Sequence, residues 1–209
     1  MALRERPRPG LGEAAVIRAA AALVDAEGVN ALTLSRLAAR LGVRIPSLYN
    51  HVAGLEDVRR GVALLGMREL TAALTRGAVG RAGEDGVVAL AEAYRLFAHE
   101  RPGLYDATLR APDPTDSLLQ EASGELMAVV RAVLTPYGLH GVNETHALRA
   151  FRSLVHGFVS LERVRGFGLP VDLDESFHHL VHLFIIGLRA EGAADESARA
   201  AQTQEGTIQ

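Results

Sequence analysis

Apolar residues recur along this chain at the spacing of α-helices, and an alternation with a period of two is nowhere sustained. The clearest stretch lies between Thr33 and Gly42, where four apolar residues at i, i+3, i+4 and i+7 form one face. These are Leu34, Leu37, Ala38 and Leu41. Gly42 suits the left-handed backbone that ends a helix, and Pro46 suits the first turn of the next one. The pattern predicts two helices joined by about three residues, which is a helix-turn-helix.

The rest of the chain also has helical periodicity. Helices at 13–27 and 55–75 flank the pair, and five more are expected at 87–100, 103–109, 115–134, 143–165 and 173–189, with prolines between them. The glycine-containing segment 77–86 is a candidate hinge. The predicted fold is all-α, with an N-terminal three-helix head joined by a fourth helix to a C-terminal helical body. The expected domains are a flexible basic arm at 1–12, the head at 13–60, the body at 61–190 and a disordered tail at 191–209.

The second helix of the pair has two sides. Val43, Leu48 and Val52 can face a core, whereas the other side mixes hydrogen-bonding groups with apolar atoms. That side consists of Arg44, Ile45, Ser47, Tyr49, Asn50 and His51. Such a mixture can meet base edges, thymine methyl groups and phosphates. The alternative is that these are ordinary surface residues of a small helical bundle.

Charge is distributed unevenly between the two parts of the chain. The net charge is −3 overall, but residues 1–60 hold nine arginines and six acidic residues, and the remainder holds thirteen arginines and nineteen acidic residues. The resulting balances of +3 and −6 place the positive charge where phosphate would be met. Arg4, Arg6 and Arg8 form a basic arm that either touches DNA or is a plain flexible terminus.

Residues 13–60 resemble the DNA-binding head of the TetR-type transcriptional regulators, through the segments Leu41-Gly-Val, Pro46-Ser-Leu-Tyr49 and His51-Val52. The resemblance implies that Ser35 and Arg36 approach the DNA backbone or a neighbouring base. Residues entering the major groove would be Arg44, Ile45, Pro46 and Ser47. Tyr49 and His51 would contact phosphates, with Asn50 reaching a base or the backbone. Members often carry a lysine where Leu55 stands here, so Arg59 or Arg60 would have to supply that cation.

The body from about residue 90 to 190 resembles the effector domain of a TetR-type subgroup named for a Trp-His-Gly motif, which here reads Val155-His156-Gly157. We hypothesise a ligand-responsive repressor, in which a small molecule entering each body moves the fourth helix, changes the spacing of the two DNA-binding heads and releases the operator. Aromatic and histidine residues on the body helices are candidates to contact an apolar effector: Tyr94, Phe97, Tyr105, Phe151 and His156. The alternative for each is a place in the hydrophobic core.

The last two helices are more apolar than packing on one side requires, since Leu183 and Ile186 add to a full apolar stripe on the final helix. A four-helix interface with a second copy would explain this. The expected interface residues are Phe151, Val155, Phe158, Phe177, Val181, Phe184, Ile185 and Leu188. A two-fold homodimer implies a near-palindromic double-stranded DNA operator, with half-sites roughly 34 Å or a multiple apart. The alternative is that these residues are buried within one chain.

Several other classes of function have little support. The chain has no cysteine, which excludes disulfides and thiol chemistry. His178 and His182 share a helix face and could bind a metal with a third ligand, but packed or interfacial imidazoles fit the sequence better, and no metal or other cofactor is expected. We find no phosphate loop, nucleophile elbow or membrane-spanning run. We therefore expect a cytoplasmic, non-enzymatic regulator, and the alternative is a helical small-molecule- or metal-binding enzyme with an incidental helix-turn-helix.

Overall fold

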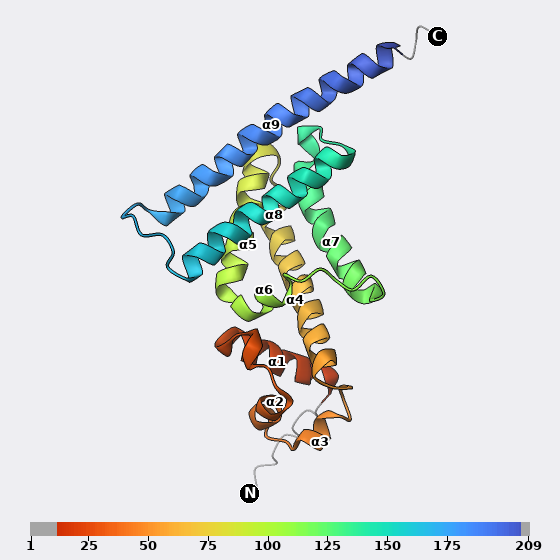
Figure 1. Ribbon diagram of the computed structural model, residues 1–209, viewed down its shortest axis with the longest axis vertical. Helices are drawn as coiled ribbons and strands as arrows, with labels where there is room; N and C mark the ends of the chain where they lie inside the picture. Colours follow the sequence, from red (N-terminus) through yellow and green to blue (C-terminus); the bar gives the residue numbers. More distant parts are fainter. Residues whose placement is uncertain (1–11, 206–209) are drawn as a thin grey trace, which may run out of the picture. The chain divides into compact units, whose positions relative to one another are not determined.

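The computed structural model describes residues 12–205, and within that range it contains helices and turns but no strand (Figure 1). The all-α fold class is therefore confirmed. No helix in the described range is long and apolar enough to cross a membrane. The elements in chain order are α1 (Glu13–Glu27), the 3-10 turn η1 (Val29–Ala31), α2 (Leu34–Leu41), α3 (Ile45–Leu48), α4 (Leu55–Ala78), α5 (Gly83–Glu100), α6 (Pro102–Ala107), α7 (Ser117–Leu134), the 3-10 turn η2 (Thr135–Tyr137), α8 (Gly141–Arg163) and α9 (Leu173–Glu205).

The chain divides into two compact units at a different place from the predicted border after Arg60. The first unit extends to Gly66 and also includes Arg101–Ala111, whereas the second comprises Met67–Glu100 and the chain from Pro112 onward. The division at Gly66 falls inside the continuous helix α4. The candidate hinge at 77–86 lies within the second unit and comprises the end of α4, a short turn and the start of α5, and Gly80 and Gly83 have φ values of 75° and 57°.

Helix α6 belongs to the first unit because α1 is built to receive it. A Cβ atom on Gly103 would lie 2.1 Å from the backbone carbon of Val24, so only glycine permits this approach of the two helices. The Asp25 carboxylate accepts hydrogen bonds from the amides of Gly103 at 2.9 Å and Leu104 at 3.0 Å, and from Arg101 Nε at 2.7 Å. Asp25 thus caps a helix that is distant in sequence. Sequence reasoning had assigned this helix to the body.

In the second unit, α5 packs against α7, α8 and α9, and α8 and α9 run side by side (Figure 1). Aromatic contacts fix the antiparallel register of α8 and α9. The ring centroids of Phe158 and Phe177 are 5.0 Å apart, and those of Phe151 and Phe184 are 5.9 Å apart. Each of these two helices therefore has an inner face toward the core and an outward face on the opposite side.

The predicted disordered tail is wrong for the described residues beyond 190, because α9 continues to Glu205. Gly192 lets α9 approach η2, since a Cβ there would lie 1.9 Å from the Tyr137 carbonyl oxygen. Asp195 accepts hydrogen bonds from the His140 amide at 3.0 Å and from Asn143 Nδ2 at 3.2 Å, at the start of α8. These contacts hold the extended helix on the second unit. Residues 1–11 of the predicted basic arm at 1–12, and residues 206–209, lie outside the described residues.

Candidate DNA-binding site

The helix pair is formed as its sequence predicts. Thr33 caps α2 by accepting a hydrogen bond from the Arg36 amide at 3.3 Å, and Gly42 ends the helix in the left-handed conformation with φ 68°. Helix α3 is a single turn that continues into a further turn through the Val52 amide, which donates to the Leu48 carbonyl at 3.0 Å. Leu48 and Val52 are buried and fix this segment on the first unit.

The opposite side of α3 and its following turn is open to solvent. Ile45 and Tyr49 keep 39% and 56% of their surface exposed, so apolar atoms are open to contact on this side. Three further predicted contact residues are also exposed, namely Arg44, Pro46 and Asn50. Ser47 and His51 are half-buried. All seven predicted residues of this segment therefore keep surface that a ligand could contact.

At the start of α2, Ser35 and Arg36 are exposed, but Arg36 has a partner that sequence reasoning missed. Its guanidinium forms an ion pair with Glu27, at the end of α1. Ser35 Oγ lies 3.1 Å from Thr33 Oγ1. No periodic signal marks Glu27, because its role follows from the packing of α1 beside α2. A phosphate contact by Arg36 would be made from this ion pair.

The two acidic residues early in α4 serve the helix itself. Asp57 Oδ2 accepts a hydrogen bond from the Ala53 amide at 2.9 Å, which satisfies a backbone group at the helix start. Glu56 Oε1 lies 2.5 Å from Arg59 Nη1. Arg59, one of the two substitutes predicted for the missing lysine, is therefore already held by its own helix.

These geometric features coincide with the regions matched by two family profiles. The profile described as "Bacterial regulatory proteins, tetR family" matches residues 16–53, and "Tetracyclin repressor-like, C-terminal domain" matches residues 87–184. The chain belongs to the TetR family. The first match covers the helix pair, and the chain is a DNA-binding transcriptional regulator of this family.

Two relatives of this TetR-family protein are named HTH-type transcriptional regulators. Rv0681 of Mycobacterium tuberculosis is 38% identical over 90% of this chain and 86% of its own length. YobS of Bacillus subtilis is 35% identical over 87% of this chain and 95% of its own length. These names agree with a regulator and do not favour the enzyme alternative.

Solved structures share the TetR fold at lower identity. A protein of unknown function from Rhodococcus sp. RHA1 has a TM-score of 0.74 at 22% identity, with 89% of this chain and 100% of that chain covered. ActR of Streptomyces coelicolor, in complex with (S)-DNPA, has a TM-score of 0.61 at 19% identity, with 88% and 100% covered.

The five candidate effector contacts of this TetR-family chain are not one cluster. Tyr94 and Phe151 meet edge to face with centroids 6.3 Å apart, and both are buried, as is Phe97. His156 is half-buried, with Nδ1 3.5 Å from Ser160 Oγ. Tyr105 lies on α6 and is fully buried in the first unit. The structure therefore brings Tyr94 and Phe151 together and assigns Tyr105 to the head.

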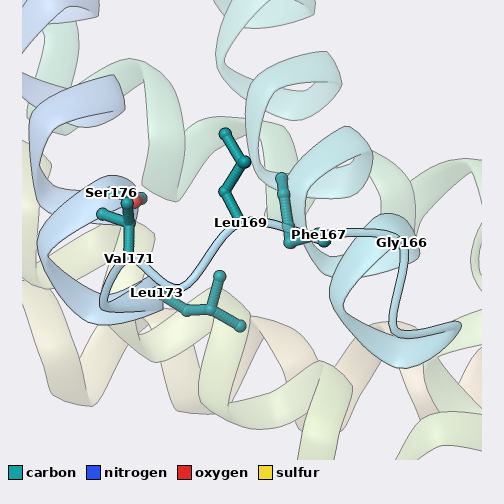
Figure 2. Close-up of a pocket in the computed structure, with 7 residues that line it drawn as sticks. Gly166, Phe167, Leu169, Val171, Leu173 and Ser176 are labelled. Carbon is teal, nitrogen blue, oxygen red and sulfur yellow. The ribbon is translucent and has the colours of Figure 1, made fainter.

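A pocket that sequence reasoning missed lies where α8 gives way to α9. It has a volume of about 300 Å³ and is lined by the loop and the first turns of α9 (Figure 2). The lining residues are Gly166, Phe167, Gly168, Leu169, Val171, Leu173 and Ser176. The available sequence signal was a run without charge between Arg165 and Asp172 that contains three large apolar residues.

The predicted dimer interface requires correction. Seven of its eight residues are buried within the single chain, so they belong to the protomer core and have almost no surface to offer a second copy. They are Phe151, Val155, Phe158, Phe177, Val181, Ile185 and Leu188, whereas Phe184 is half-buried. The exposed apolar residues on the same helices are different ones. Leu161, Leu183 and Ile186 keep 48%, 52% and 48% of their surface.

Two of the histidines on α9 pair with carboxylates of α5. His178 Nε2 lies 2.8 Å from Glu92 Oε1, and His182 Nδ1 lies 3.1 Å from Glu84 Oε1, which also places its second oxygen 2.6 Å from Arg189 Nη2. The Arg189 and His182 hydrogen bonds lower the pKa of Glu84. Among residues 12–205 no three His, Asp or Glu side chains gather as a metal site would require. The imidazoles join α9 to α5.

Proposed function

We propose that this TetR-family regulator is a dimeric repressor that leaves a near-palindromic operator when a small molecule binds its body. The observation that carries the DNA-binding half is the exposed side of α3, where Tyr49 and Ile45 lie beside Arg44 while Leu48 holds the helix from behind. Arg44, Ile45, Pro46 and Ser47 would enter the major groove. Tyr49, Asn50 and His51, with Ser35 and Arg36, would fix the register on the backbone.

The dimer would form through the outward faces of α8 and α9. Leu183 and Ile186 are half exposed there, and a Cβ atom added at Gly157 or Gly187 would meet nothing within 4 Å, so a second helix can come close. An isologous contact of this face presents two copies of α3 related by a two-fold axis, and that symmetry is what an inverted repeat matches.

The effector would bind in the second unit, where a cavity would have to open beside the buried rings of Tyr94, Phe97 and Phe151 and the half-buried imidazole of His156. The ActR complex supports this proposal at the level of a shared fold. We also assign the body to the Trp-His-Gly subgroup, with Val155 of the Val-His-Gly triplet in the core and Gly157 on the outward face. Release would require a higher affinity of the effector for the arrangement that does not fit DNA. The site of action would be the cytoplasm.

Selection from a random duplex pool at low salt tests the DNA-binding proposal. We expect enrichment of an inverted repeat, and binding that weakens steeply as salt rises. Arg44→Ala and Tyr49→Ala should each weaken operator binding about 10- to 100-fold. Arg81→Ala, which removes an exposed arginine from the second unit, is the matched control and should bind like the parent. Failure to enrich any inverted repeat would refute the repressor proposal.

A further inference from the structure

The loop between α8 and α9 exposes an unusual amount of apolar surface. Val164, Leu169 and Val171 keep 73%, 80% and 58% of their surface in contact with solvent, and Phe167 keeps 36%. No charged residue lies between Arg165 and Asp172. Contiguous apolar surface of this kind on a folded protein marks a contact with another molecule.

The loop has a defined backbone and is fixed to the body. The Gly166 amide donates to the Leu161 carbonyl at 2.7 Å, and the Val171 amide donates to the Leu169 carbonyl at 2.9 Å. The Phe167 ring packs on Phe158 with centroids 4.8 Å apart. Figure 2 shows Leu169 projecting from the loop beside the pocket of about 300 Å³. The loop therefore offers both a projecting leucine and an apolar recess in a preformed arrangement, which lowers the entropic cost of binding.

The loop is continuous with the outward face of α8 and α9. Leu161 contacts the loop directly, because a Cβ on Gly166 would meet Leu161 Cδ2 at 3.1 Å. Val164 ends the row of exposed or half-buried positions Arg149, Ser153, Gly157 and Ser160 along α8. An interface formed by this face would therefore extend onto the loop.

Glu175 and Arg149 are exposed charged residues at opposite ends of that face. Beside the loop, α9 begins with the exposed acidic residues Asp172, Asp174 and Glu175, of which Asp174 pairs with Arg95 at 2.7 Å, and the end of α8 and the start of the loop carry the exposed Arg163 and Arg165. At the other end, near the start of α8, His146 and Arg149 are exposed, and the antiparallel register places Arg149 beside Ile186 of α9. Two copies related by a two-fold axis perpendicular to the helices place Glu175 of each copy toward Arg149 of the other. The parallel arrangement would place Glu175 against Glu175 and Arg149 against Arg149, which are like charges.

We propose that the α8–α9 loop docks on a second copy of this chain, at the end of the partner's outward face that carries Arg149 and Ile186. The proposal rests on the dimer proposed above and adds its direction and its outer contact. Leu169 packs beside the partner's Ile186, and Glu175 faces the partner's Arg149. The occupant of the loop surface is thus this chain itself.

Cross-linking from a single cysteine tests the contact, because the chain has no cysteine of its own. Leu169→Cys labelled with benzophenone maleimide should give a product of twice the chain mass upon illumination, joined to residues 142–152 or 186–194. Leu96→Cys is the matched control, since Leu96 is an exposed leucine of α5 at 57% and should give no such product. Light scattering of the unmodified chain measures, in parallel, whether the chain is a monomer or a dimer.

The outcomes separate the loop contact from the dimer itself. A dimer by light scattering without a cross-link from Leu169→Cys overturns the loop contact and leaves the proposed dimer intact. A chain that stays monomeric at every concentration overturns both. A cross-link from one loop to the other loop overturns the antiparallel direction.

Charge reversal gives an independent test of the direction. Glu175→Arg alone or Arg149→Glu alone should weaken dimerisation about ten-fold, because each places like charges opposite one another. The double variant should return the dimer dissociation constant to within about two-fold of the parent, since it restores unlike charges. If the two single-variant increases in the dimer dissociation constant instead multiply in the double variant, the pairing of Glu175 with Arg149 is overturned.

Discussion

Replacing Asp25 tests whether α6 is held on α1 in the way the structure indicates. The Asp25 carboxylate satisfies two amides at the start of α6 and pairs with Arg101, and its side chain is only 17% exposed. Asp25→Ala removes all three contacts and leaves the amides of Gly103 and Leu104 without their acceptor. Asp25→Asn keeps an oxygen that can cap the helix but removes the charge.

The expected magnitude follows from these contacts. Loss of a side-chain cap costs about 0.5–2 kcal/mol. A hydrogen bond between charged groups contributes about 1.5–3 kcal/mol, at the lower end here because Arg101 is one-third exposed. We therefore expect Asp25→Ala to lower the free energy of unfolding by about 2–4 kcal/mol, and Asp25→Asn by about 1–2 kcal/mol. Glu27→Ala, on the same helix, removes an exposed ion pair and should change it by less than about 0.5 kcal/mol.

Urea unfolding followed by far-ultraviolet circular dichroism measures the total change, at one fixed protein concentration because dimerisation shifts apparent stability. Hydrogen exchange then localises it, since amides of α1 and α6 should lose protection while those of α9 keep theirs. An Asp25→Ala protein within 0.5 kcal/mol of the parent, or one whose α6 amides exchange at the parent rate, would refute the capping role of Asp25.

Two further predictions concern packing and pH. Gly103→Ala should lower the free energy of unfolding by about 3 kcal/mol or more in the same urea assay, because its Cβ would overlap the backbone of α1. The control Gly124→Ala on α7 adds a Cβ that meets nothing within 4 Å, and it should raise the free energy of unfolding by about 0.5–1 kcal/mol. Equal changes in the two variants would contradict this packing of α6 on α1. The hydrogen bond from Arg95 lowers the pKa of Glu162 from its ordinary value of 4.5, so the stability that Glu162 contributes is present above that pH and is lost as the pH falls through the lowered pKa. Urea midpoints measured from pH 6 to pH 3 should fall less steeply for Glu162→Gln, and parallel curves would contradict this role.

The helix-turn-helix could be predicted because its determinants are local. The spacing of leucines before Gly42, the conformation that this glycine adopts and the proline that follows it all lie within a dozen residues, and each has the same meaning in any fold. The exposed side of α3 followed directly from that local reading. The family resemblance depended on the same segment, and the profile match at residues 16–53 confirms it.

The placement of α6 could not be predicted in the same way, because it depends on residues about 80 positions apart. Asp25 looks like any acidic residue near the end of a helix, and Gly103 looks like a loop glycine beside a proline. Only when α1 and α6 meet does Asp25 become a cap and Gly103 a point of close approach. The predicted end of the last helix at residue 189 was wrong for the same reason, since Gly192 and Asp195 acquire their roles only beside η2 and α8.

The predicted dimer interface named residues that are buried within the single chain, and the physical reason for this error shows which helix face should be tested against a partner. The argument for a second partner rested on the surplus residues Leu183 and Ile186, yet it assigned the interface to the aromatic stripe. Large aromatic side chains fill space between α5, α8 and α9, so they are buried before any second copy arrives. The surplus stripe remains outside, and it carries glycine and serine at Gly157, Gly187 and Ser153 where a solvated helix would carry long charged side chains. In a helix with two apolar stripes, the stripe of mixed leucine and small residues is therefore the one to test against a partner.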